Sequence, residues 1–358
     1  MIPIARPIIG IEEREAVDRV LASGSLAQGP EVASFEQEFA KFVGERKCVA
    51  VNSGTSALLI SLVSAGIRTG DEVIVPSFTF AATANSVALT GATPVFVDID
   101  PSTYNISPEA IESAITKRTR AIQPVHLFGQ TADMHRVMEI ALRHNLLVFE
   151  DASQAHLSSF HGKPAGTWGD AATFSFYPTK NMTSGEGGMV SCRDEAIART
   201  CRLLRNQGME NRYQNEIVGY NLRMTDIHAA IGREQLKKIA NWTLKRQSNA
   251  KFFDENLRNV VVPHVMEGAT HVYHQYTIRV PESDRNSFAE EMMKRGVGNG
   301  VYYPRPVHQL PAYGQKFDLP NTSKACEEVL SIPVHPGLSK EDLERIVVVV
   351  NQLAKAGA

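Results

Sequence analysis

Short apolar runs alternate with helical patterns through the first half of the chain, and this alternation limits the possible folds more than any other feature. The runs fall at residues 47–51, 72–75, 94–98, 120–125, 146–149, 172–176 and 188–192. Strands that alternate with helices favour a mostly parallel sheet covered by helices on both faces. The sequence therefore predicts an α/β protein whose ligand cleft lies outside the carboxyl ends of the strands.

Two helices precede this alternating region and one long helix follows it. The spacing of apolar residues predicts the first two over 10–22 and 31–44. A long helix is predicted over 226–257, where the apolar spacing persists with few breakers and Asp226 can cap the first turn. We expect this helix to carry the chain out of the region that holds the sheet.

The remaining C-terminal part is smaller and mixes strand and helix patterns. It contains the strand pattern HVYHQYTIRV, the helical pattern RNSFAEEMMKRG, the segment VGNGVYYPRP and the terminal helical pattern SKEDLERIVVVVNQLAKA. We therefore predict two domains, a large domain over 1–245 and a smaller α+β domain over 246–358.

Charge and cysteine content argue against several classes of protein. The 358 residues carry 37 basic and 39 acidic side chains, and the net charge of −2 gives no reason to expect nucleic acid or a membrane surface as a partner. No apolar run approaches the ~20 residues needed to cross a bilayer. Four cysteines, at positions 48, 192, 201 and 326, have no zinc-site spacing. We expect no metal, and reduced thiols in a cytoplasmic protein.

The stretch 174–190, FSFYPTKNMTSGEGGMV, places Lys180 just past an apolar strand and before a loop with three glycines. A lysine at a buried strand end, beside backbone that can adopt positive φ, suits a nucleophile that forms a Schiff base in a dry cleft. A surface lysine in a turn is the alternative, and this stretch alone leaves both interpretations open.

Two further segments favour the first interpretation. In 148–156, VFEDASQAH, a strand ends on Glu150 and Asp151, and pyridoxal phosphate needs a carboxylate at such a place to keep its pyridine nitrogen protonated. In 49–66, VAVNSGTSALLISLVSAG, a strand and a small polar turn lead into a helix, whose N-terminus can bind phosphate. Each segment is weak alone, but the order of phosphate turn, carboxylate and lysine is more specific.

Nearly the whole chain resembles the DegT/DnrJ/EryC1/StrS family of pyridoxal-phosphate aminotransferases, which act on nucleotide-linked ketosugars. The resemblance rests on PIARPIIGIEEREAVDRVLASG, NSGTSAL, PSFTFAATANSVALTGATPVFVDID, EDASQAH, SFYPTKNMTSGEGGMV, GYNLRMTDIHAAIG and VYYPRPVHQLPAY. It implies an aspartate-aminotransferase-type fold (fold type I), with the cofactor in the large domain and the smaller α+β domain at the C-terminus. Some relatives replace the lysine with histidine and are dehydratases, whereas this chain keeps Lys180.

The resemblance also assigns roles to individual residues. Lys180 binds the cofactor covalently and moves the proton of transamination, and Asp151 pairs with the pyridine nitrogen. Glu150, which points the opposite way along a strand, is the less favoured partner. Gly54, Thr55 and Ser175 are expected to bind the cofactor phosphate, and Asn221 the phosphate in the partner subunit's site. Phe80, with Phe78 as the alternative, is expected to stack on the cofactor ring, and Gln154 to contact the cofactor oxygen or the sugar. Tyr303 and His308 are expected to bind the substrate.

The expected reaction moves an amino group from L-glutamate, through pyridoxamine phosphate, to the ketone of a nucleotide-linked deoxysugar. The GEGG loop at 185–188 leans slightly toward transfer at C4. The product would serve surface polysaccharide or natural-product aminosugar synthesis, and the protein is expected to be a homodimer with shared active sites. The alternatives are a dehydratase and a non-catalytic regulatory protein of the same fold. His126 and His156 receive no role.

Overall fold

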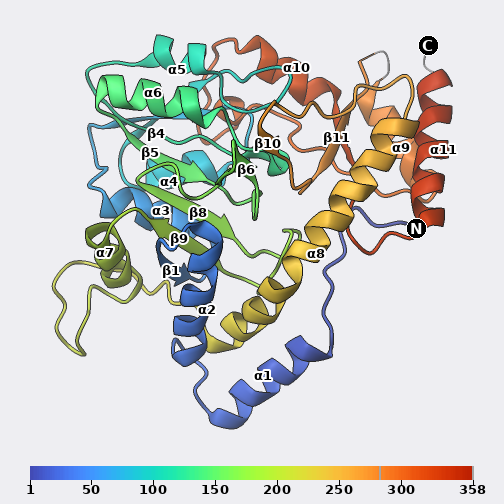
Figure 1. Cartoon of the computed structure of the whole chain (residues 1–358). Helices are drawn as coiled ribbons and strands as arrows, with labels where there is room; N and C mark the ends of the chain where they lie inside the picture. Colours follow the sequence, from blue (N-terminus) through green and yellow to red (C-terminus); the bar gives the residue numbers. More distant parts are fainter. Residues whose placement is uncertain (282–283, 357–358) are drawn as a thin grey trace.

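The computed structural model describes residues 1–281 and 284–356, and Figure 1 shows its course. A seven-stranded sheet runs in the order β1-β9-β8-β5-β4-β2-β3, with β9 antiparallel to both of its neighbours and the other strand pairs parallel. Its strands are β1 (Lys47–Val51), β2 (Glu72–Pro76), β3 (Thr93–Val97), β4 (Thr119–Ile122), β5 (Leu147–Asp151), β8 (Ala171–Ser175) and β9 (Gly188–Cys192). The predicted α/β fold with a mostly parallel sheet is confirmed.

Strand β4 ends three residues before its predicted end at 125 because Pro124 has no N–H to donate to the ladder. The chain stays beside β5 all the same. Asp151 N–H donates to the Pro124 carbonyl at 2.8 Å, and His126 N–H donates to the Asp151 carbonyl at 3.0 Å. These bonds hold the carboxyl end of β5, where the predicted cofactor acid lies.

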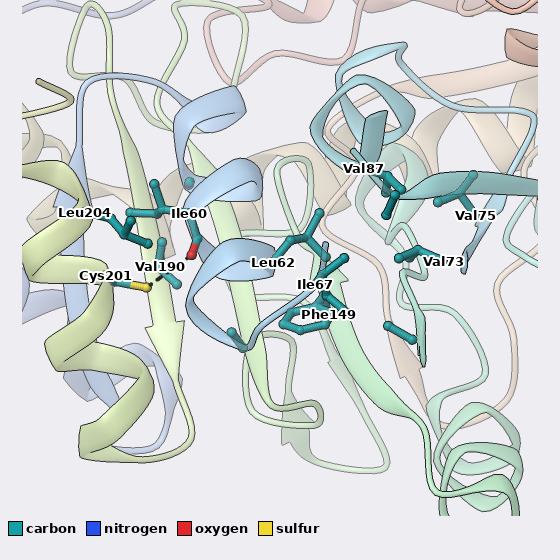
Figure 2. Packing of buried hydrophobic residues seen from close by; sticks show 14 of the residues in the cluster. Ile60, Leu62, Ile67, Val73, Val75, Val87, Phe149, Val190, Cys201 and Leu204 are labelled. Atoms are coloured by element: carbon teal, nitrogen blue, oxygen red, sulfur yellow. Dashed lines mark hydrogen bonds between the residues drawn. The ribbon is translucent and has the colours of Figure 1, made fainter. Parts of the chain in front are cut away.

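Helices cover both faces of the sheet, as its apolar residues require. On one face lie α3 (Gly54–Ser64), α4 (Ala82–Leu89) and α7 (Glu195–Arg205). Figure 2 shows this packing, with Ile60 and Leu62 from α3 and Leu204 from α7 lying against residues of the sheet such as Val190 and Phe149. The other face packs against α5 (Pro108–Ala114), α6 (Met134–His144) and the helices α2 and α8 described below. The strands are therefore buried on both sides, and side chains reach a ligand only at their ends.

The N-terminal helices pack on the long helix. They are α1 (Ile11–Ser23) and α2 (Pro30–Ala40), the latter followed by the short 3₁₀ turn η1 (Lys41–Val43), and the long helix is α8 (Asp226–Asn256). Asp226 does not cap α8, which corrects our prediction. The Thr225 side chain accepts from His228 N–H instead. Asp226 Oδ1 accepts from Gly29 N–H at 2.8 Å and Val32 N–H at 3.0 Å, so it caps α2 and ties the two helices together.

The C-terminal elements form a second core around a two-stranded antiparallel sheet. They are β11 (Tyr276–Arg279), α9 (Arg285–Lys294), η3 (Val307–Gln309), α10 (Pro320–Glu328), β12 (Val329–Ile332) and α11 (Lys340–Ala356). The strand predicted over 271–280 is shorter, and α10 and β12 were not predicted. Smaller elements are η2 (Leu127–Gly129) and the three-stranded sheet of β6 (Ser159–Phe160), β7 (Lys163–Pro164) and β10 (Ala269–Thr270).

Helix α8 joins the two cores. It begins beside α2 and ends among the C-terminal elements (Figure 1). There Ala250 and Phe253 pack with Ile278 and Ile346. Ile2 belongs to this second core as well, so the chain begins at the C-terminal side. The boundary between the two predicted domains, at 245/246, stays a prediction. Residues 282–283 and 357–358 of the predicted small domain lie outside the described residues.

Two observations concern other predictions from the sequence. All four cysteines are buried free thiols, as expected. Among the described residues, the helices include none with the length and apolar character that a membrane span requires.

Candidate active site

A cavity of about 660 Å³ opens at the carboxyl ends of the strands. It brings together most of the predicted site residues, although they come from segments far apart in the sequence. Those that line it are Gly54, Thr55, Phe80, Asp151, Gln154, Ser175, Lys180 and Tyr303. The cleft thus lies at the edge of the sheet where the alternating pattern placed it.

Lys180 lies in the loop between β8 and β9. Its backbone N–H donates to the Tyr177 carbonyl at 2.9 Å, which shapes the turn that follows β8. Burial lowers the pKa of its ammonium group from 10.5 to about 8, and the attraction of the Asp151 carboxylate opposes that shift only in part. A larger share of the amine is therefore neutral near physiological pH than for a surface lysine, as a nucleophile requires.

Asp151 ends β5 and is only 5% exposed. Each of its carboxylate oxygens accepts one hydrogen bond: Oδ2 from Thr83 Oγ1 at 2.8 Å, and Oδ1 from Ser153 N–H at 3.2 Å. The acid is therefore both oriented and shielded, as a partner for a protonated ring nitrogen must be.

Glu150, the neighbouring acid, faces away from the cavity. Its carboxylate accepts from the N–H groups of Gly166, Trp168 and Gly169 at 2.7–2.9 Å. His126 Nε2 lies 2.9 Å from it, and because His126 Nδ1 accepts from a backbone N–H, Nε2 carries the hydrogen and donates. Burial works against ionisation, yet the bond from His126 and the backbone bonds keep the pKa of Glu150 below its usual value. Glu150 is structural, as its predicted direction implied.

The start of α3 forms a cradle for an anion. The Ser53 side chain accepts from Ser56 N–H at 3.1 Å, and among the described residues the N–H groups of Gly54 and Thr55 have no partner. A Cβ on Gly54 would lie 2.8 Å from Cβ of Ser175, so only glycine lets these two segments approach so closely. Two free amides and a hydroxyl at a helix N-terminus match the needs of a phosphate group.

Aromatic and amide side chains also line the cavity. Phe80 is 60% exposed and its ring centroid lies 6.1 Å from that of Tyr303, whereas Phe78 is buried in the core beside Phe128. Phe80 is therefore the ring that faces the cavity. Gln154 bonds to both Phe128 N–H and the Tyr303 hydroxyl.

Two predicted residues do not join the others. His308 is completely buried, with its Nδ1 2.7 Å from Ser77 Oγ and its Nε2 3.1 Å from the Phe317 carbonyl, so we do not retain it in the substrate site. Asn221 is exposed and lies on the segment that pairs with Asn206, and it does not line this chain's cavity.

The model of the DegT/DnrJ/EryC1/StrS aminotransferase family matches residues 7–351. The chain belongs to this family. Three of its relatives are similar to this chain to about the same degree. GDP-perosamine synthase of Caulobacter vibrioides is 40% identical and covers 98% of both chains. A protein of Geobacillus stearothermophilus named pleiotropic regulatory protein is 40% identical (94% and 92% covered). The dTDP-3-amino-3,6-dideoxy-alpha-D-galactopyranose transaminase of Aneurinibacillus thermoaerophilus is 39% identical (95% of each).

Solved structures agree with this membership. DesV of S. venezuelae, crystallised with a ketimine intermediate, is 38% identical, with a TM-score of 0.93 over 96% of this chain and 95% of that one. Spr1654 of Streptococcus pneumoniae, named a putative sugar aminotransferase, has been solved in its PLP form, with 27% identity and a TM-score of 0.95 over 100% and 99% of the two chains. The family member described here is a pyridoxal-phosphate-dependent aminotransferase of the aspartate-aminotransferase type.

The residues of the cavity fit this cofactor. When bound, pyridoxal phosphate supplies a ring that accepts electrons from the substrate carbon. The cradle at Gly54, Thr55 and Ser175 would hold its phosphate, Asp151 its ring nitrogen, and Lys180 its aldehyde carbon.

Several cavity residues were missed by the sequence analysis. Thr79 lines the cavity, and Thr83 reaches Asp151 from behind it. Thr79 lies in the bend before α4 and Thr83 in its first turn, so the helical periodicity gave no signal for this pair. His274 and Gln275 come from the C-terminal part, where nothing in the local pattern distinguishes them from core residues.

Proposed function

We propose that this aminotransferase moves an amino group from L-glutamate to the ketone of a nucleotide-linked deoxysugar. The observation that carries the proposal is the meeting of Lys180 and Asp151 in one cavity of about 660 Å³ with the phosphate cradle. A cavity of this size has the volume of sites that hold whole cofactors or drug-sized ligands.

The chain's own residues supply binding and proton transfer. With its pKa lowered to about 8 by burial, the Lys180 amine can accept and return a proton, the requirement for a general base that acts near neutral pH. Asp151 supplies a fixed negative charge, and Phe80 offers an apolar ring to one side of the ligand. Tyr303, held by Gln154, is proposed to contact the sugar.

The names of relatives support the substrate class. GDP-perosamine synthase and the dTDP-aminosugar transaminase both carry a nucleotide-linked sugar in their names. The GEGG loop at 185–188, whose Glu186 lines the cavity, slightly favours transfer of the amino group to C4 of the sugar. L-Glutamate is the donor implied by the resemblance to the family, and the aminosugar product would serve surface polysaccharide or natural-product synthesis.

We further propose a homodimer in which Asn221 reaches the phosphate of the partner subunit's site. Asn221 lies outside its own cavity and follows a polar loop that also exposes a few large apolar side chains, among them Tyr213 (79% exposed) and Val218 (94% exposed). Figure 1 shows the loop after α7 projecting from the molecule. Large apolar side chains exposed on a projecting loop favour burial against another chain.

The remaining expectations stay predictions. They are the large cofactor domain over 1–245, the small domain over 246–358, and a cytoplasmic location. A dehydratase is disfavoured because Lys180 is present. A non-catalytic regulatory protein is disfavoured because the cavity retains both the base and the acid that transamination needs.

A two-stage experiment tests the proposed function. Borohydride is added to the yellow cofactor-loaded protein, and peptide mapping is expected to find the reduced cofactor on Lys180. Separately, L-glutamate is added without a sugar, and the visible absorbance of the cofactor is expected to fall as 2-oxoglutarate forms. Candidate nucleotide-linked ketosugars should then restore it. An adduct on another lysine, or no reaction with any amino donor, would overturn the proposal.

A further inference from the structure

Two threonines, one just before α4 and one in its first turn, form a chain of hydrogen bonds that ends on the Asp151 carboxylate. Thr83 Oγ1 lies 2.8 Å from Asp151 Oδ2, and Thr79 Oγ1 lies 3.0 Å from Thr83 Oγ1. Thr83 is fully buried, and Thr79 and Asp151 are 2% and 5% exposed. Solvent therefore has little access to these hydroxyl groups, and a hydrogen bond to a charged group is strong in such a place.

The direction of the two hydrogen bonds follows from the number of hydrogens. An ionised carboxylate can only accept, so the single hydroxyl hydrogen of Thr83 points at Asp151. Thr83 then has no hydrogen left for Thr79, and Thr79 must donate to Thr83. The chain of donors runs from Thr79 to Thr83 to Asp151, and each bond polarises the next toward the carboxylate.

The Thr83 backbone is fixed from two sides, which makes it a rigid support. It lies in the first turn of α4, and its carbonyl accepts from Ser86 Oγ at 2.8 Å and from Gln123 Nε2 at 3.3 Å. Gln123 directly follows β4, the strand beside β5, so Thr83 and Asp151 are held by neighbouring parts of one framework. The β-branched side chain also has few rotamers in a helix.

We propose that Thr83 is a positioning residue for transamination. It acts through Asp151 and therefore rests on the role proposed for that acid. Together with the Ser153 N–H on the other oxygen, the Thr83 hydroxyl holds the carboxylate in one orientation. A bound cofactor then meets an acid that is already oriented.

The test compares Thr83→Val, which keeps the branched shape and removes the donor, with Thr83→Ser, which keeps the donor, and with Asp151→Asn. For each cofactor-loaded variant we would measure the rate of the half-reaction with L-glutamate between about pH 6 and pH 9. The pH titration of the cofactor's visible absorbance, its dissociation constant and the thermal midpoint give readouts that do not depend on turnover.

We expect Thr83→Val to slow the half-reaction by about tenfold or more, the effect of one lost hydrogen bond to a charged group. Its rate–pH profile and its absorbance titration should both differ from those of the wild type, because the carboxylate is no longer held in one orientation. Thr83→Ser should stay within about twofold of the wild type. A merely structural role would lower the thermal midpoint without moving either pH profile.

The variants separate failure of this inference from failure of the proposed function. If Asp151→Asn slows the half-reaction strongly while Thr83→Val has wild-type rates and pH profiles, Thr83 does not position the acid. If Thr83→Ser is as slow as Thr83→Val, the hydroxyl is not the group that matters, and the inference is also wrong. If Asp151→Asn itself turns over normally, the role proposed for the acid has failed. Should Thr83→Val not fold, the comparison of Thr83→Ser with Thr83→Ala decides in the same way.

Discussion

The side chain of Gln154 donates a hydrogen bond to the hydroxyl of Tyr303 across 3.1 Å. The oxygen and nitrogen of the Gln154 amide cannot exchange positions, because the oxygen accepts from Phe128 N–H at 2.8 Å. Tyr303 therefore accepts from Gln154 and keeps its own hydrogen free to donate. Burial raises the pKa of the Tyr303 hydroxyl, so that hydrogen stays in place throughout the working pH range.

We expect Tyr303→Phe to lower kcat/KM for the ketosugar by about tenfold, since one donor is lost and Gln154 Nε2 is left without an acceptor. The half-reaction with L-glutamate should change much less. Tyr313→Phe is the matched control, because the Tyr313 hydroxyl donates to Asn85 Oδ1 and does not line the cavity. Equal losses in both half-reactions would argue against a contact with the sugar.

Asp151→Asn keeps the shape of the acid and removes its charge. We expect the cofactor still to bind while the half-reaction with L-glutamate slows by about a hundredfold or more, as when a preorganised electrostatic contact is removed. Stopped-flow absorbance measures the rate. Near-normal turnover would place the acid that pairs with the ring nitrogen elsewhere.

Gly54→Ala tests the phosphate cradle. The added methyl group would lie 2.8 Å from Cβ of Ser175, so the start of α3 must move. We expect the dissociation constant for pyridoxal phosphate to rise by about tenfold or more, measured by fluorescence titration of the cofactor-free protein. Gly337→Ala is the control, because its Cβ would have no neighbour closer than 3.4 Å. Unchanged affinity in Gly54→Ala would show that the phosphate binds at another place.

Lys180 makes the folding stability of the cofactor-free protein depend on pH. The pKa of Lys180 is about 8 in the folded protein, whereas the ordinary value of 10.5 applies to the unfolded chain. Between these two pH values the unfolded chain therefore binds a proton that the folded protein does not. Stability therefore rises with pH across this window, and below about pH 8 the cost of the buried charge is fully present.

Lys180→Met removes that cost. We expect the variant to be more stable than the wild type at about pH 7, with a difference that shrinks as the pH approaches about 10. Urea unfolding of both cofactor-free proteins measures it, and Lys251→Met, which changes a lysine whose side chain is 77% exposed, is the control. A stability difference that does not depend on pH would mean that the amine is not desolvated.

Mixed dimers test the sharing of active sites. Lys180→Ala and Asn221→Ala, provided that the second is severely impaired alone, are unfolded and reassembled together. With shared sites, one site of a mixed dimer collects both defects and the other has none, so roughly a quarter of the wild-type activity should return for random pairing. If mixed dimers form without activity, Asn221 acts in its own chain's site or in no site.

The sequence predicted the strands well, and it singled out candidate site residues that the cavity brings together. Apolar runs bounded by polar turns indicate the strands, and the polar segments that follow them indicate Asp151, at the end of β5, and Lys180, in the loop after β8. Both signals are local. They needed no knowledge of which segments meet.

Two predictions that the structure does not support depended on contacts between distant segments. His308 was predicted at the substrate, but its ring is enclosed by Ser77, 231 positions away, and by the carbonyl of Phe317. Asp226 has the residue type and place of a cap for α8, yet its carboxylate serves α2, nearly 200 positions earlier. A polar side chain has several possible partners, and only the fold decides among them.

Glu150 and Asp151 lie side by side on β5 and face opposite ways. Because side chains alternate along a strand, a slip of β5 by one residue would turn Glu150 toward the cavity and Asp151 toward the amides of Gly166, Trp168 and Gly169. The shorter Asp151 side chain would leave those amides and His126 poorly matched. The four donors around Glu150 therefore oppose such a slip, and hydrogen bonds on the side of β5 that faces away from the cavity help to keep Asp151 turned toward it.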